Sequence, residues 1–321
     1  MTVNLPPWPM FGFADDVRPA LRAALAAGGP AALATIVALG GGGPRPVGTQ
    51  MVIAPDIVSG FLSGGCLEAD VAGIARDVLA SGEPRRLVYG EGSPWPDIRP
   101  MCGARIEVQL ERIAQGDEAA IRLFALTDAR APARWLSDGA RRLCVPLGDT
   151  TQDWPGAFRK IYLPAPRLIV LGADPTALAI AALGAQSGWE TTLVRPKGPV
   201  DAPPLVGVAY RREEASEALA AIGLDAWTAV AVATHDVDLD RAALIVALPS
   251  KAFYVGALGA RRRLPERVAG LAAAGLTATT IARLHVPIGL DIGGKAPWEV
   301  AIAVLAQIVA LRHSGQQGAD A

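Results

Sequence analysis

One short segment combines a thiol, two glycines and a carboxylate, and it is the first candidate for chemistry in the chain. Its residues are Ser63, Gly64, Gly65, Cys66, Leu67 and Glu68. The segment follows a strand-like apolar run, 57–62, and precedes a helical pattern over 67–80. A helix start lowers the pKa of a thiol, and glycines leave backbone amide groups free to face an anion. We expect a ligand-binding turn with a reactive Cys66, although a tight turn with a buried, inert cysteine explains the local sequence equally well.

A second cysteine–glycine pair, Cys102-Gly103, stands at the edge of an alternating strand pattern over 105–110. We expect Cys66 and Cys102 to face one cleft. Their spacing fits no four-ligand zinc pattern, which argues against a structural zinc site. Cys144 lies on another strand pattern and is expected to be structural.

Arg45 is the candidate anion-binding residue of the first half of the chain. It follows a run of glycines, 40–43, and lies between Pro44 and Pro46, which stiffen the segment. A glycine run followed by a held arginine fits an anion clamp. A solvated loop arginine is an equally good interpretation.

Residues 167–194 predict a β-α-β unit of the kind that begins a Rossmann-like sheet. Of the dinucleotide-binding glycines only the first, Gly172, is present. Asp174 stands in place of the second, and would put a carboxylate where a pyrophosphate should approach. Arg195 replaces the acidic residue that would hold the ribose of NAD. NAD binding is therefore disfavoured, and NADP would explain Arg195 but not Asp174.

Strand and helix patterns continue to alternate up to residue 312, which predicts a doubly wound parallel sheet. Ligands of such folds bind beyond the carboxyl ends of the strands. Three arginines, 261–263, open a helix there and can bind phosphate, unless they are a solvated basic helix start. The candidate residues expected at this edge are Gly172, His235, Gly259, Arg261, Arg262, His285 and Asp291.

Length and composition limit the possible domain organisation, binding partners and cellular location of the protein. A chain of 321 residues suggests two domains, and prolines near residue 164 mark the boundary. We predict an N-terminal α/β domain with a mixed sheet over 1–163 and the doubly wound domain over 164–321. A net charge of −1 gives no support for nucleic-acid binding. Three dispersed cysteines, no secretory signal and no apolar run of about 20 residues predict a cytoplasmic protein without a membrane span.

The chain resembles the XdhC/CoxI family, the accessory factors of molybdenum hydroxylases such as xanthine dehydrogenase. The resemblance rests on the segments 44–52, 63–68, 102–103, 234–236, 252–262 and 285–293. It implies an N-terminal domain that carries the cysteines, a C-terminal Rossmann domain, and a homodimer. It further implies binding of the molybdenum cofactor, help with its terminal sulfuration alongside a cysteine desulfurase, and delivery to the apo-hydroxylase.

The leading hypothesis from this resemblance is therefore a cofactor-insertion chaperone, with molybdopterin or its cytosine dinucleotide form as the implied cargo. Nothing in the sequence resembles a catalytic triad, an acid/base pair of carboxylates or a hydride-transfer site, so turnover of a small substrate is not indicated. An NADP-dependent oxidoreductase and a structural adaptor without cofactor are the alternatives. The expected cofactor-binding residues of the first half are Arg45, Ser63, Gly64, Gly65, Cys66, Glu68, Cys102 and Gly103, with Cys66 and Cys102 facing the metal.

Overall fold

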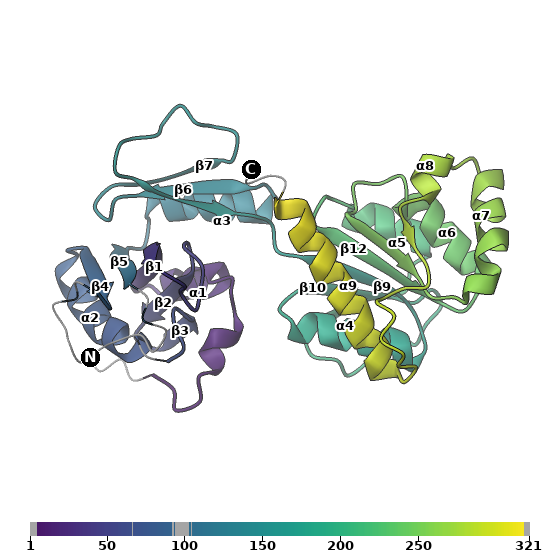
Figure 1. The fold of residues 1–321 in the computed structure, drawn as a ribbon, viewed down its shortest axis with the longest axis horizontal. Coiled ribbons are helices and arrows are strands. Elements are labelled where there is room, and N and C mark those ends of the chain that lie inside the picture. The colour runs from purple at the N-terminus through teal and green to yellow at the C-terminus, as the bar shows by residue number, and fades with distance from the viewer. Residues whose placement is uncertain (1–4, 66, 92, 94–102, 104, 318–321) are drawn as a thin grey trace. The chain divides into compact units, whose positions relative to one another are not determined.

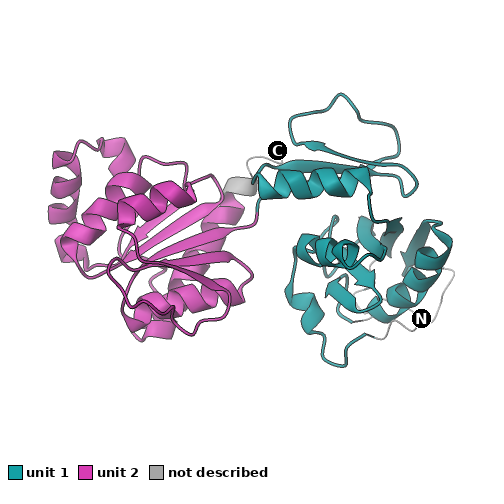
Figure 2. Ribbon diagram, turned by 180° about the vertical axis from the view of Figure 1, so that it is seen from behind, with its two compact units in different colours: residues 1–164 teal, residues 165–321 magenta. Residues whose placement is uncertain are grey.

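A computed structural model describes residues 5–317 apart from 66, 92, 94–102 and 104. The chain divides into two compact units, Met1–Pro164 and Ala165–Ala321 (Figure 2). Within the described residues, no helix is both long enough and apolar enough to cross a membrane.

The first unit is built on a five-stranded sheet with the order β3-β2-β1-β5-β4 (Figure 1). Every neighbouring pair in it is antiparallel. The expectation of a mixed sheet is therefore corrected: β1 pairs antiparallel with β5, a strand distant in the sequence, and no local pattern indicates the direction of such a pairing. The strands are β1 (Ala31–Gly40), β2 (Gln50–Ala54), β3 (Ile57–Gly60), β4 (Arg85–Tyr89) and β5 (Arg105–Ile113).

Both faces of this sheet are covered, because successive side chains of a strand point to opposite faces. From β1, Ala32, Ala34 and Ile36 pack with the apolar side of α2 (Glu68–Ser81). The alternate residues Ala31 and Leu33 pack against the helices on the other face. Those helices are α1 (Arg18–Ala26) and α3 (Glu118–Asp128), and a single 3-10 turn, η1 (Met10–Phe13), precedes them.

A small antiparallel sheet completes the first unit, with the order β7-β6-β8. Its strands are β6 (Ala133–Ser137), β7 (Arg142–Pro146) and β8 (Phe158–Tyr162). A buried polar network ties it to β5. The carboxylate of Glu111 accepts from Ser137 Oγ at 2.7 Å and from Arg142 Nε at 3.0 Å, and Arg142 also donates to Asp117 at 2.7 Å. Burial raises the pKa of Glu111, although the Arg142 guanidinium acts in the opposite direction.

The second unit is a six-stranded parallel sheet with the order β11-β10-β9-β12-β13-β14, which confirms the predicted doubly wound fold. Its strands are β9 (Arg167–Gly172), β10 (Glu190–Val194), β11 (Val208–Arg211), β12 (Thr228–Ala233), β13 (Tyr254–Ala257) and β14 (Leu284–His285). The order reverses between β9 and β12, so their carboxyl ends frame the crevice in which such folds bind ligands.

Helices cover both faces of the parallel sheet (Figure 1). On one face, α4 (Pro175–Gln186) and α9 (Pro297–Gln317) pack against Leu168 and Val170 of β9. The alternate residues Ile169 and Leu171 meet the helices of the opposite face. Those are α5 (Ala215–Ile222), α6 (Val237–Ala247), α7 (Leu264–Ala273) and α8 (Ala278–Ile281), with a 3-10 turn, η2 (Arg261–Arg263), before α7.

Removing Arg142 is expected to destabilise the first unit strongly. In Arg142→Ala the buried carboxylate of Glu111 loses its partner, and breaking a buried ion pair from one side costs about 3–5 kcal/mol. The measurement is urea unfolding near neutral pH. The deficit should shrink as the pH falls, because a carboxyl whose folded-state pKa is raised takes up a proton and loses its uncompensated charge.

Arg86→Ala is the matched control for this variant. Arg86 pairs with Glu107, but its side chain is 53% exposed, so its loss should change the free energy of unfolding by about 1 kcal/mol or less. Equal losses in the two variants would contradict the role given to the Glu111 network.

Candidate functional site

The turn between β3 and α2 is closed by the carboxylate of Glu68. One oxygen, Oε1, accepts from the backbone amides of Leu62 at 2.9 Å and Ser63 at 2.7 Å. The other, Oε2, accepts from Ser63 Oγ at 2.8 Å and from the amide of Leu67 at 3.2 Å. Glu68 is 1% exposed, so this carboxylate shapes the turn from inside. We expected Glu68 to contact a ligand, whereas the structure engages both oxygens within the turn.

The two glycines of this turn lie at the surface. Gly65 has a left-handed backbone with φ +96°, a conformation that glycine adopts without strain. An added Cβ at either Gly64 or Gly65 would meet no atom of the described residues within 4 Å. The helix begins at Glu68 with Leu67 as its N-cap, and Ser63 Oγ accepts from the Leu67 amide at 3.1 Å rather than capping the helix directly.

The two candidate thiols, Cys66 and Cys102, both lie outside the described residues. Gly103 is described and exposed, with φ +69°, and an added Cβ there would meet no atom of the described residues within 4 Å. Cys144 is 3% exposed on β7, and burial raises its pKa to about 12. A thiol with so high a pKa stays protonated at neutral pH, which suits a structural residue.

The loop after β1 holds a second basic side chain beside Arg45. Arg45 pairs with Asp15, and its Nε is buried without a hydrogen-bond partner in the described chain. Lys160 of β8 donates to the carbonyl oxygen of Gly48 at 2.6 Å. Burial lowers the pKa of Lys160 to about 8. Sequence reasoning missed Lys160, because more than a hundred residues separate it from the loop that it contacts.

In the second unit, Gly172 allows the turn after β9 to approach β12. A Cβ there would lie 2.5 Å from the carbonyl oxygen of Ala233 and 2.6 Å from Cβ of Ala177. Both distances are shorter than real contacts, so any larger residue would push the turn away. Gly172 therefore packs against its own chain at the point where the strand order reverses.

Asp174 and His235 contact each other at the point where the strand order of the parallel sheet reverses. Asp174 caps α4 by accepting from the Ala177 amide at 2.8 Å, and its other oxygen lies 3.0 Å from Nε2 of His235. Burial acts to raise the pKa of Asp174, but these two contacts outweigh it and hold the pKa below its usual value. His235 has φ +59° and a side chain that is 55% exposed. The carboxylate expected to oppose a pyrophosphate is thus engaged in a helix cap and an imidazole contact.

A buried ion pair lies beneath the turns that follow β12 and β13. Asp240 of α6 accepts from Thr234 Oγ1 at 2.6 Å and from Arg267 Nη2 of α7 at 2.9 Å. Arg267 also donates to the carbonyl oxygen of Leu258 at 3.1 Å, while its Nη1 is buried without a partner in the described chain. The pair fixes the turn that carries His235 against the one that carries Gly259. Sequence reasoning missed it, since the two residues lie on different helices and neither belongs to a motif.

The three arginines after β13 are exposed. They form the 3-10 turn η2, and α7 begins only at Leu264, so the expected single helix from residue 261 is corrected. Pro265 stands in the first turn of α7, where its missing amide hydrogen costs nothing. Arg261 reaches Asp291 at 3.3 Å, with both side chains more than three-quarters exposed. Such a pair contributes little to stability and leaves the arginine open to another anion.

His285 differs from the other candidates because it lies within the sheet. Its ring stacks on Tyr254 with centroids 4.9 Å apart, and burial lowers its pKa. A neutral, half-buried imidazole is less suited to hold an anion than His235. The carboxyl edge therefore brings together Gly172, His235, Gly259 and the Arg261–Asp291 pair, whereas Arg45, Ser63, Gly64, Gly65, Glu68 and Gly103 belong to the first unit.

Replacing Glu68 by glutamine is expected to destabilise the protein by about 2 kcal/mol. The amide keeps one acceptor but presents its NH2 group to backbone donors, so buried hydrogen bonds to a charged group are lost. Urea unfolding measures the loss. Glu83→Gln, at an exposed position after α2, is the control and should change stability by less than about 0.5 kcal/mol. Equal stability of the two variants would contradict the conclusion that Glu68 closes the turn between β3 and α2.

Comparison with known proteins places the chain among relatives of similar length. The family model of the XdhC and CoxI family matches residues 24–90, and that of the XdhC Rossmann domain matches residues 168–308. The molybdenum cofactor insertion chaperone PaoD of Escherichia coli (strain K12) is 31% identical over 93% of this chain and 89% of its own. A protein of Bacillus subtilis (strain 168) described as a probable xanthine dehydrogenase subunit is 25% identical over 88% of this chain and 93% of its own.

A crystal structure of a xanthine dehydrogenase from Bacillus halodurans has the same fold, with a TM-score of 0.75 over 92% of this chain and 96% of that chain, at 23% identity. Identity of 31% along nearly the whole chain, together with the two family matches, shows that the chain belongs to the XdhC and CoxI family.

Proposed function

We propose that this protein binds the molybdenum cofactor as cargo and delivers it to the apo form of a xanthine dehydrogenase-type molybdenum hydroxylase. The observation that carries the proposal is the 31% identity, over 93% of the chain, to a protein named a molybdenum cofactor insertion chaperone. In this role the protein performs no turnover of a small substrate.

The carboxyl edge of the second unit suits the phosphate of such a cargo. Arg261 and Arg262 are exposed at η2, and His235 is exposed at the neighbouring turn. Arg267 Nη1 is a buried donor without a partner in the described chain, close behind Gly259, where an added Cβ would lie 3.1 Å from Nη2 of the same guanidinium. Guanidinium groups bind phosphate through charge-assisted hydrogen bonds. The donor set at this edge therefore fits a phosphorylated cargo.

A contact with the metal is proposed for residues of the first unit. Cys66 and Cys102 are soft ligands of the kind that suits molybdenum or its terminal sulfur. They lie outside the described residues, and the support comes from the turn that precedes Cys66, where Gly64 and Gly65 are exposed and Glu68 holds the backbone. Arg45 and Gly103 are further proposed cofactor-binding residues of this unit.

The finer steps of the function are part of the same proposal. The protein assists the terminal sulfuration of the cofactor, with a cysteine desulfurase as the source of sulfur, and acts in the cytoplasm as a homodimer. The cargo is molybdopterin or its cytosine dinucleotide form. An NADP-dependent oxidoreductase has less support, because the Asp174 carboxylate caps α4 at the position where the pyrophosphate of a dinucleotide would approach.

The proposal predicts saturable binding of free molybdenum cofactor with a dissociation constant in the micromolar range or below, about −8 kcal/mol. Replacing both Arg261 and Arg262 by alanine should weaken it by about 2–4 kcal/mol, since charge-assisted contacts are worth ~1.5–3 kcal/mol each and are not additive. Fluorescence of the oxidised pterin measures the bound fraction.

The control for the arginine pair is Arg85→Ala/Lys251→Ala, which removes the same charge at two exposed positions outside this edge. It should bind as tightly as the unmodified protein. A wild-type titration without saturation up to about a hundred micromolar contradicts the function itself. Equal affinity of the two double variants for the cofactor would instead indicate that η2 is a solvated basic turn that does not bind the phosphate.

Cys66→Ser is expected to reduce cofactor retention and hydroxylase activation while leaving the melting temperature nearly unchanged. Cys102→Ser should act similarly, to an equal or smaller degree. Cys144→Ser should retain cofactor but lose about 1–3 kcal/mol of stability, because it buries a hydroxyl in an apolar site. Alkylation rates of single-cysteine variants at neutral pH check the order of reactivity. If Cys144 reacts fastest, or Cys66→Ser retains full cofactor and activation, the role proposed for the glycine–cysteine turn is wrong.

A further inference from the structure

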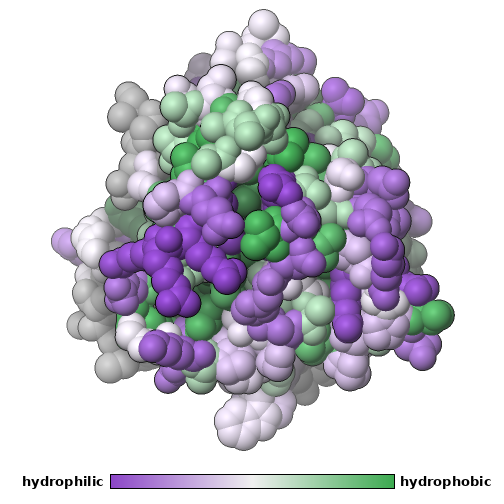
Figure 3. Space-filling model, turned by 90° about the vertical axis from the view of Figure 1, so that its right-hand side faces the viewer, coloured by the Kyte–Doolittle hydropathy of each residue, from purple (hydrophilic) through white to green (hydrophobic). Residues whose placement is uncertain are grey.

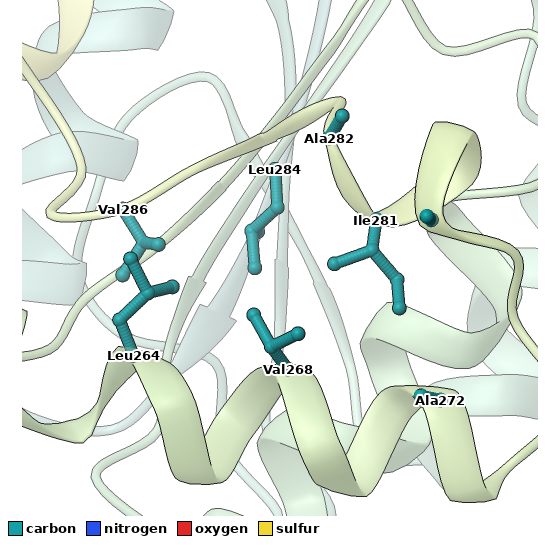
Figure 4. A pocket seen from close by; sticks show the side chains of 8 residues that line it. Leu264, Val268, Ala272, Ile281, Ala282, Leu284 and Val286 are labelled. Atoms are coloured by element: carbon teal, nitrogen blue, oxygen red, sulfur yellow. The ribbon is translucent and has the colours of Figure 1, made fainter.

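A cavity of about 390 Å³ opens between α7, α8 and the edge strand β14. One face of α7 lines this cavity through three residues spaced four apart, Leu264, Val268 and Ala272. Figure 4 shows Leu264 and Val268 pointing toward Leu284 and Val286, with Ile281 of α8 closing the side. The side chains that line it are all apolar.

This cavity is open because no described element covers the outer face of α7. Leu271 points the other way and is buried in the core under the sheet. Val268 is 36% exposed, and Ala272 is exposed. Neighbouring elements are too short to cover the gap, since β14 has two residues and α8 has four. The apolar face of α7 is therefore exposed at the protein surface and is not a gap in the hydrophobic core.

Positive charge adjoins the cavity. Residues 259–286 contain five arginines and a single acidic residue, Glu266. The side chains of Arg262 and Arg263 make no hydrogen bond or ion pair with the part of the chain that the structure describes. Leu264, which lines the cavity, directly follows Arg263, so the cavity begins where the arginine turn ends. Figure 3 shows this end of the protein, where apolar surface lies among strongly hydrophilic side chains.

The chemistry of the lining distinguishes between two kinds of occupant. Sites for small molecules place a few polar groups among apolar ones to orient the ligand. The side chains that line this cavity carry none. Pockets that accept a single apolar anchor from a protein partner need no such group, because the rest of the interface sets the orientation. The unpaired Arg263 then favours a partner with a carboxylate beside its anchor.

We propose that this cavity docks a protein segment that inserts one large apolar side chain and presents an acidic residue to Arg263. Building on the proposed function, the partner is the apo-hydroxylase that receives the cofactor. Docking here places the recipient beside the turn that carries Arg261, so that the cargo passes between adjoining surfaces without release into solution.

Two adjacent alanines of α7 give a matched test. Ala272 lines the cavity, and Ala273 does not, although both are exposed in the last turn of the same helix. Ala272→Glu puts a carboxylate into the apolar cavity, whereas Ala273→Glu adds the same charge outside it. With purified apo-hydroxylase titrated against the full chain, Ala272→Glu should weaken binding at least tenfold and Ala273→Glu less than twofold. Arg263→Glu should weaken binding and flatten its dependence on salt.

Cofactor binding, measured on the same variants, separates this proposal from the proposed function. Both alanine variants should bind free cofactor as the unmodified protein does. Equal effects of the two alanine variants on hydroxylase binding overturn the docking proposal, as does a wild-type protein that binds no apo-hydroxylase at about ten micromolar. A change of oligomeric state confined to Ala272→Glu, seen by size-exclusion chromatography, also overturns it and assigns the face to a second copy of this chain. Failure of cofactor binding with intact docking overturns only the proposed function.

Discussion

The buried ion pair between Asp240 and Arg267 is the contact on which the carboxyl edge of the second unit depends. It lies under two turns that leave neighbouring parallel strands, and it is joined to both through Thr234 and the Leu258 carbonyl. The side chains of the pair are 6% and 15% exposed. Losing one partner would leave a buried charge uncompensated, a cost of about 3–5 kcal/mol, so the two turns stay in register with each other. His235 and Gly259 occupy defined positions at the edge for this reason.

The first unit uses a buried carboxylate in a related way. Glu68 engages the amides of Leu62, Ser63 and Leu67, so the backbone on both sides of Gly64 and Gly65 is fixed while the glycines themselves stay at the surface. In both units a charge satisfied inside the chain holds a glycine-containing turn. The turns are therefore preorganised, and a ligand that binds them does not have to order them first.

Sequence reasoning succeeded where a local pattern determines the structure. Alternation of strands and helices after residue 165 predicts parallel strands joined by crossovers, and the observed sheet is parallel throughout. The turn that contains Asp174 was predicted to lead into a helix, and the structure shows Asp174 as the cap of α4, whereas its opposition to a pyrophosphate stays a prediction. The mixed sheet was a wrong expectation, because the pairing of β1 with β5 joins segments some seventy residues apart that carry no sign of their direction.

Contacts between distant segments explain what the sequence could not predict of the candidate site. The Lys160 contact with Gly48, the Arg267 contact with Asp240 and the Arg261 contact with Asp291 each join residues that are far apart in the chain. None of these side chains differs in type from ordinary surface residues. Glu68 was noticed, but its direction was not predictable, because a glutamate at a helix start can face solvent or turn back to the preceding loop.

The exposure of the arginine turn bears on how a carrier can release its cargo. Arg261 already pairs with Asp291 at the surface, so a phosphate bound there, as proposed, would gain only the difference between its own contact and that pair. Once that phosphate left, the carboxylate would return to the guanidinium, which would lower the cost of release. A buried guanidinium without such a partner would hold an anion more tightly and exchange it more slowly, because its desolvation would have to be reversed. An edge that combines a fixed backbone with exposed, exchangeable charges is therefore better suited to handing a ligand on than to retaining it.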